Sequence, residues 1–148
     1  MDLQYIFTSM DGRINRAKWW AGIVILGIIF IVFGVFIEVI FGTGFFGGLL
    51  ATLLTLALFF PTYAVCFKRF QDRDKPGKTA LYGLVPFLIA FLFSAWGLTG
   101  TSTENNALGW LCALAVLGVL LWFAIELGIL KGTPGANQFG GDPLAALN

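Results

Sequence analysis

Four stretches of this chain are long and apolar enough to cross a membrane, and they constrain its fold more than any other feature. They cover residues 19–41, 45–67, 79–97 and 107–130, and the only charged side chains within them are Glu38 and Glu126. A helix of about 20 residues crosses a hydrocarbon core about 30 Å thick. The sequence therefore predicts an all-α fold, an integral membrane four-helix bundle.

The composition supports this prediction. Hydrophobic residues make up 58% of the 148 residues and charged residues 11%, which is about half the charged share of an average soluble domain. A soluble domain of this length could not bury so much apolar surface. We expect residues 1–148 to form a single membrane domain.

The cationic side chains are confined to three segments. Residues 1–18, 68–78 and 131–148 contain all nine Lys and Arg residues, and the other two connections, 42–44 and 98–106, contain none. Four membrane crossings place the three basic segments on one side. The positive-inside rule then predicts that this side, with both termini, is cytoplasmic.

The basic segments themselves carry few signs of fixed structure. Residues 1–18 are amphipathic, which favours an interfacial lead-in to the first span with its cations at the lipid headgroups. We expect residues 68–78 to form a charged loop. The tail, residues 132–148, is rich in Gly, Pro and Asn, a composition typical of turns or disorder.

Three acidic residues are candidates for a structural or functional role. Carboxylates within spans are costly, so Glu38 and Glu126 are intramembrane acidic candidates. They lie towards opposite faces, which disfavours a direct pair, and Glu126 is close enough to the basic side to pair with its cations. Asp72 is either a solvated partner of nearby cations or an anchor that orients arginines from two segments.

Small residues recur along one side of the second span. Gly44, Gly48 and Thr52 are spaced four apart, and such spacing lets a neighbouring helix approach closely. The pattern indicates either a helix contact or the chance effect of a glycine-rich composition. Pro61 and Pro86 lie inside the second and third spans, where they are expected to bend the helices.

Several classes of chemistry are absent from the sequence. It contains no His, the commonest general base and metal ligand. Cys66 and Cys112 lie in apolar runs near opposite faces, so we expect unpaired thiols. No catalytic set, phosphate-binding loop or metal-ligand cluster is present. We expect no enzyme, no cofactor, no metal and no nucleic-acid partner.

Three basic stretches together resemble the DUF805 family of small bacterial inner-membrane proteins. They are residues 12–20, 68–73 and 131–143, and the resemblance covers nearly the whole chain. It implies a multi-pass protein of the bacterial inner membrane and supplies no activity, because the family's function is unassigned. The positions that match the family pattern are Arg13, Arg16, Trp19, Trp20, Arg69, Asp72, Arg73, Gly77, Gly132, Thr133, Gly135, Asn137, Phe139, Gly140, Asp142 and Pro143.

We expect the three basic segments, residues 1–18, 68–78 and 131–148, to fold together into one structure beneath the bundle, which we call the basic cap. Its site residues are Arg13, Arg16, Arg69, Asp72, Arg73 and Asn137.

Two functions remain open from the sequence. The first is a non-catalytic scaffold or accessory subunit whose basic cap binds a protein partner or anionic lipid. The alternative is a small oligomeric transporter or channel that uses Glu126 and the bends at Pro61 and Pro86. Membrane lipids, a membrane-protein partner and further copies of the chain are the expected partners.

Overall fold

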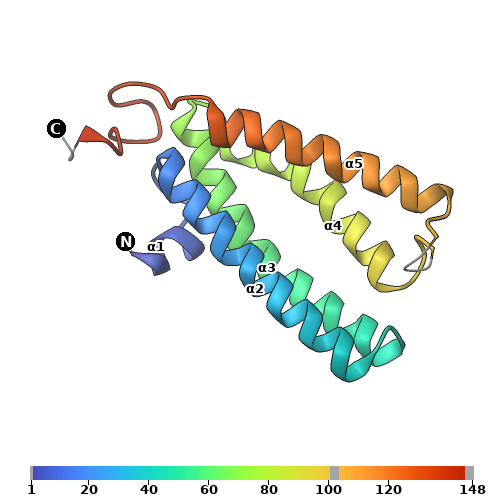
Figure 1. Cartoon of the computed structure of the whole chain (residues 1–148). Coiled ribbons are helices and arrows are strands. Elements are labelled where there is room, and N and C mark those ends of the chain that lie inside the picture. Colours follow the sequence, from blue (N-terminus) through green and yellow to red (C-terminus); the bar gives the residue numbers. More distant parts are fainter. Residues whose placement is uncertain (1, 101–103, 146–148) are drawn as a thin grey trace.

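The structure, a computed structural model, describes residues 2–100 and 104–145, and its regular elements are helices joined by turns and irregular segments (Figure 1). No strand is present in these residues, so the predicted all-α class is confirmed. The elements in chain order are α1 (Leu3–Thr8), α2 (Arg16–Phe41), α3 (Phe45–Asp72), the 3₁₀-helix η1 (Gly77–Ala80), α4 (Leu81–Ala95), α5 (Ala107–Phe123) and the π-helix η2 (Ala124–Ile129).

Four helical segments of the described chain are long and apolar enough to cross a membrane, as predicted. They are Arg16–Phe41, Phe45–Asp72, Gly77–Ala95 and Ala107–Ile129, where the last two run through η1–α4 and α5–η2. Only 6–22% of the residues in their most apolar windows are buried within the protein, as expected for helices that face lipid.

The helices form two hairpins that meet at one end. α2 and α3 make the first hairpin, and α4 and α5 make the second (Figure 1). α1 and the described part of the tail lie at the end where α3 leads into η1, which we call the cap end. The turn at residues 42–44, the end of α4 and the start of α5 lie at the other end, which we call the far end (Figure 1).

Polar side chains cap the N-terminal ends of α2 and α5, which lie at opposite ends of the molecule. The Asn15 side chain accepts a hydrogen bond from the Lys18 amide at 2.9 Å, and Asn106 accepts one from the Gly109 amide at 2.8 Å. Each satisfies an amide that the first turn of a helix leaves without a partner. These residues fix where α2 and α5 begin.

α3 is longer than the sequence indicated. Residues 68–78 were expected to form a loop, but the helix continues to Asp72, so the loop prediction is wrong for its first five residues. Charge was taken as a sign of solvent, whereas the Lys68 and Arg69 side chains are completely buried. Their heads find partners inside the protein, and the chain therefore has no reason to leave the helix.

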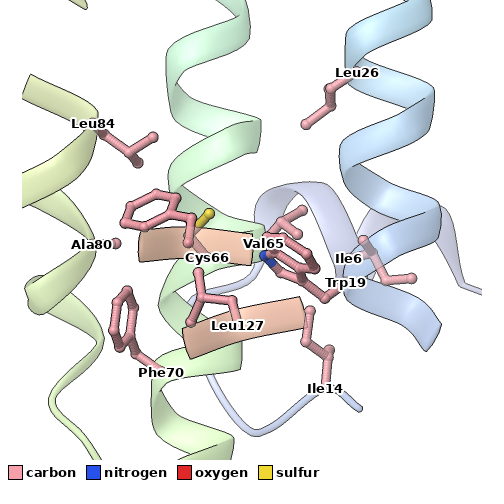
Figure 2. Close-up of a cluster of buried hydrophobic side chains, with 11 residues drawn as sticks. Ile6, Ile14, Trp19, Leu26, Val65, Cys66, Phe70, Ala80, Leu84 and Leu127 are labelled. Carbon is pink, nitrogen blue, oxygen red and sulfur yellow. The ribbon is translucent and has the colours of Figure 1, made fainter. Parts of the chain in front are cut away.

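The buried apolar core lies at the cap end (Figure 2). Trp19 of α2, Phe70 of α3 and Leu127 of η2 lie at its centre, and Ile6 and Ile14 close it from the N-terminal segment. The two hairpins and the N-terminal segment are thus joined in one place. Cys66 lies in this core, and both cysteines are free thiols, as expected.

Candidate functional site

Asp72 is the centre of a buried ion-pair network. Its Oδ1 accepts from Arg13 Nε at 3.1 Å and lies 3.0 Å from Arg13 Nη2, while its Oδ2 is paired with Arg69 Nη1. All three side chains are at most 4% exposed. Asp72 joins the N-terminal segment to the end of α3, which is the anchor role considered above, not that of a solvated pair.

Arg13 holds the C-terminal tail, and Arg69 holds the end of η2 that leads into it. Arg13 donates to the carbonyls of Thr133, Gly135 and Gly140 at 2.6, 2.7 and 3.3 Å. Arg69 donates to the carbonyls of Leu127 and Leu130 at 2.7 and 2.6 Å. Guanidinium groups suit this task because their N–H donors point in fixed directions.

The tail is folded as far as residue 145, so of the two alternatives that its composition indicated, turns and not disorder are present in residues 132–145. The Thr133 amide donates to the Asp72 carbonyl at 2.8 Å, and Asn137 Nδ2 donates to the Gln71 carbonyl at 2.9 Å. Gly132 lies directly against the Asp72 carboxylate, where a Cβ would overlap it. Gly and Asn therefore serve close approach and turn geometry. Residues 146–148 lie outside the described residues.

Lys68 fastens the N-terminal segment. Its Nζ donates to the carbonyls of Tyr5 and Ile6, both at 2.9 Å, and to that of Ser9. It also lies 5.0 Å from the centre of the Tyr5 ring. A cation at these carbonyls stabilises the C-terminal end of α1.

The cations of residues 1–18 were expected at the lipid headgroups. This expectation is wrong for Arg13, because its side chain is buried within the protein. Tyr5 packs into the same region, where burial and then the charge of Asp11 raise the pKa of its hydroxyl.

Glu126 belongs to the basic cap. Its Oε1 accepts from Lys75 Nζ at 2.6 Å and from Arg73 Nε at 3.2 Å, and Arg73 also donates to the Lys131 carbonyl at 2.6 Å. Glu126 lies in η2, and π-helical turns occur often at functional sites. The pairing with basic residues that the sequence suggested is present.

Glu38 is not part of this arrangement. It is exposed near the end of α2, at the far end of the molecule.

A pocket of about 350 Å³ opens in the basic cap between the start of α2 and the tail. Arg16 and Lys131 are exposed beside it, and Arg16 donates to the Ile129 carbonyl at 2.9 Å. The amides of Leu144 and Gly135 donate to the Asp142 carboxylate and hold its pKa below the usual value. The polar residues that line the pocket are Asn15, Arg16, Arg69, Asp72, Lys131, Thr133 and Asp142.

The structure brings Arg13, Arg69, Asp72, Arg73 and Asn137 together with Arg16 at the pocket's edge. Sequence reasoning missed the roles of Lys68 and Thr133. For Lys68 the sequence did contain a signal, because residues 68, 69, 72 and 73 have the spacing of neighbours on one helix face. Within residues 2–100 and 104–145, no group of three His, Cys, Asp or Glu side chains could hold a metal ion.

The chain matches the family model described as "Protein of unknown function (DUF805)" over residues 7–141. It is 28% identical to the inner membrane protein YhaH of Escherichia coli (strain K12) over 139 residues, which cover 93% of this chain and 88% of that protein. Inner membrane protein YhaI of the same strain is 28% identical over 137 residues, covering 93% and 87%. The uncharacterized protein YiiR is 29% identical over 142 residues, covering 96% and 90%. No solved structure matches.

Proposed function

Because the chain belongs to the DUF805 family, whose function is unassigned, we propose a function from the structure of the basic cap. We propose that the protein is a non-catalytic inner-membrane protein and that its basic cap binds the phosphate groups of anionic lipids. The four membrane-capable helices and the inner-membrane relatives support the location. The basic cap supports the binding role, since it contains every cationic side chain of the chain.

The observation that carries the proposal is that some of these cations are buried and bonded within the protein, whereas others are exposed. Arg13, Lys68 and Arg69 are buried and bonded within the protein. Arg16 and Lys131 are exposed at the edge of the pocket. The buried cations hold the cap together. The exposed Lys131 ammonium and the Arg16 donors that do not bind the Ile129 carbonyl remain available for a phosphate, which guanidinium and ammonium groups bind well.

The position of the pocket fits a lipid headgroup. Arg16 precedes Trp20 by one helical turn, and Trp20 is 44% exposed at the start of a membrane-capable helix. Tryptophan is enriched at the membrane interface. Arg16 is therefore expected at headgroup depth, where each cation contributes about 1 kcal/mol towards binding anionic lipid.

The test compares lipid retention by native mass spectrometry after release from bilayers of phosphatidylglycerol and phosphatidylcholine with identical chains. The double variant Arg16→Gln/Lys131→Gln is expected to lose roughly 30-fold in the preference for phosphatidylglycerol, because two cations are removed. Arg16→Lys/Lys131→Arg keeps both charges and should keep the preference.

Lys78→Gln is the matched control, because Lys78 is an exposed cation in η1 that does not line the pocket. An equal loss in this control would mean diffuse attraction and would refute the pocket. A stoichiometric protein that copurifies with the chain and is lost in the double variant, while lipid retention is unchanged, would instead identify a protein partner.

The transporter alternative has less support. It relied on Glu126 as a polar group inside the membrane, whereas Glu126 is paired with Lys75 and Arg73 at the cap end. Transport sites usually lie near the bilayer midplane.

We also propose that the basic cap faces the cytoplasm, from the positive-inside rule. A fluorescent protein fused after residue 148 is expected to fluoresce in bacterial cells, and alkaline phosphatase fused after Asn105 is expected to be active outside the cytoplasm. Active phosphatase at the C-terminus together with inactive phosphatase at Asn105 would reverse the orientation.

A further inference from the structure

A cleft at the far end, remote from the basic cap, is lined by α2, α3 and α4. It consists of an outer cavity of about 670 Å³, a middle one of about 360 Å³ and an inner one of about 200 Å³. Glu38 and Ser94 line both the outer and the middle cavity, and Phe30 and Phe91 line both the middle and the inner one. The three cavities therefore adjoin along one path.

The polarity of the cleft changes along this path. The outer cavity is bordered by Glu38, Thr43, Thr99 and Asn105. The innermost wall is formed mainly by Ile, Leu and Phe side chains. The distance from Glu38 to Leu26 along α2 is roughly 18 Å. The cleft thus has the form expected for an amphiphile, with a polar mouth and an apolar interior.

Two threonines of the inner wall do not change this character. The Thr55 hydroxyl donates to the Ala51 carbonyl and the Thr62 hydroxyl to the Leu58 carbonyl, both at 2.7 Å. Their hydrogen-bond donors are used within α3. A ligand in the inner cavity would therefore meet hydrocarbon.

Glu38 gives the mouth of the cleft its charge. Every Lys and Arg of the chain belongs to the basic segments at the cap end. Among residues 2–100 and 104–145, no ion pair includes Glu38. Glu38 is exposed at the far end of α2, where its negative charge attracts cationic groups. Charge complementarity therefore calls for a cationic group from outside this chain.

A contact between an α2 and an α4 side chain excludes a helix as the occupant of the cleft at depth. The Phe30 and Phe91 rings meet edge to face with their centroids 5.0 Å apart. Packed helices keep their axes about 8–10 Å apart and are about 10 Å wide. A helix of a second copy cannot lie between these rings, whereas a hydrocarbon tail can lie along them.

We propose that this cleft binds a phospholipid with a primary-ammonium headgroup, taken from the leaflet at the far end. The ammonium group donates to the Glu38 carboxylate, and the polar groups of Thr43, Thr99 and Asn105 flank the phosphate. One tail lies in the middle cavity and along Phe30 and Phe91. The site is independent of the lipid pocket in the basic cap and takes a different headgroup.

Gly34→Leu tests the site by filling it. Gly34 lines the outer and middle cavities, and a Cβ added there would meet nothing within 4 Å. Leucine is a good helix former, so α2 should be preserved. Gly118→Leu is the matched control: a Cβ at Gly118 in α5 also meets nothing within 4 Å, and Gly118 does not line any of the three cavities.

The readout is native mass spectrometry after release from bilayers of phosphatidylethanolamine and phosphatidylcholine with identical chains. The protein is expected to retain the ethanolamine lipid roughly fivefold in preference, since only that headgroup donates hydrogen bonds to Glu38. Gly34→Leu and the isosteric Glu38→Gln should abolish the preference. Gly118→Leu and Arg16→Gln/Lys131→Gln should keep it.

No preference in the unaltered protein, or an equal preference in Glu38→Gln, would overturn the proposal. If Gly34→Leu does not fold, Glu38→Gln decides alone, because it changes charge without changing shape. A dimer that Gly34→Leu dissociates, with no headgroup preference, would also overturn it and would identify the cleft as a contact between copies.

Discussion

Replacing Asp72 with asparagine is expected to lower the free energy of unfolding by about 3–5 kcal/mol, the usual cost of removing one partner from a buried ion pair. The substitution removes the charge that balances the Arg13 and Arg69 guanidinium groups. Both arginines are buried, so water would solvate their charges poorly in place of the carboxylate. Because Arg13 also holds the tail, the tail is expected to become sensitive to protease.

Asp74→Asn is the control for this variant. Asp74 is exposed two residues further on, and its backbone φ of 58° suits asparagine as well as aspartate. Reversible unfolding in detergent and limited proteolysis of the tail provide the measurements. If Asp72→Asn were as stable as Asp74→Asn and its tail as resistant, Asp72 would not be the anchor of the basic cap.

Replacing Lys68 with methionine is expected to release the N-terminal segment and to cost about 2–4 kcal/mol. Methionine fills a similar volume but leaves the carbonyls of Tyr5, Ile6 and Ser9 without their shared donor. Each lost hydrogen bond contributes about 1 kcal/mol, and buried acceptors without partners add to the cost. Hydrogen exchange should accelerate in α1 and leave the far end of the bundle unchanged.

Lys78→Met provides the comparison for Lys68, because it removes an exposed lysine from the same end of the protein. It should leave α1 protected. Unchanged exchange in α1 of Lys68→Met would show that the apolar contacts of Ile6 hold the segment without the ammonium group.

The helices were predictable because their signal is local. Runs of about 20 apolar residues determine a membrane span whatever surrounds them. The end of α3 was not predicted, because Lys68 and Arg69 are charged and charge usually marks solvent. Their helical spacing with Asp72 was visible, but their partners in the N-terminal segment and at η2 lie at least 58 residues away in sequence.

The tail is a second segment whose structure could not be predicted from its composition. Gly132 and Asn137 indicate a turn or disorder, yet here they allow close approach to Asp72 and a bond to the Gln71 carbonyl. The small-residue pattern of the second span was partly informative: a Cβ at Gly48 would lie 2.9 Å from the Ala95 carbonyl of α4, whereas one at Gly44 would meet nothing within 4 Å.

The cleft beside Glu38 could not be predicted, because it depends on the relative positions of three helices. Sequence spacing gives the face of one helix but not the distance to its neighbours.

Hydrogen exchange of the tail amides in a lipid bilayer tests the central claim most directly, that the three basic segments form one folded cap around Asp72. The Thr133 amide donates to the Asp72 carbonyl and the Gly140 amide to the Asn137 carbonyl. Both are expected to exchange roughly 100-fold or more slowly than in an unfolded peptide. In Asp72→Asn this protection should be lost. Exchange at the rate of an unfolded peptide in the unaltered protein would contradict the account.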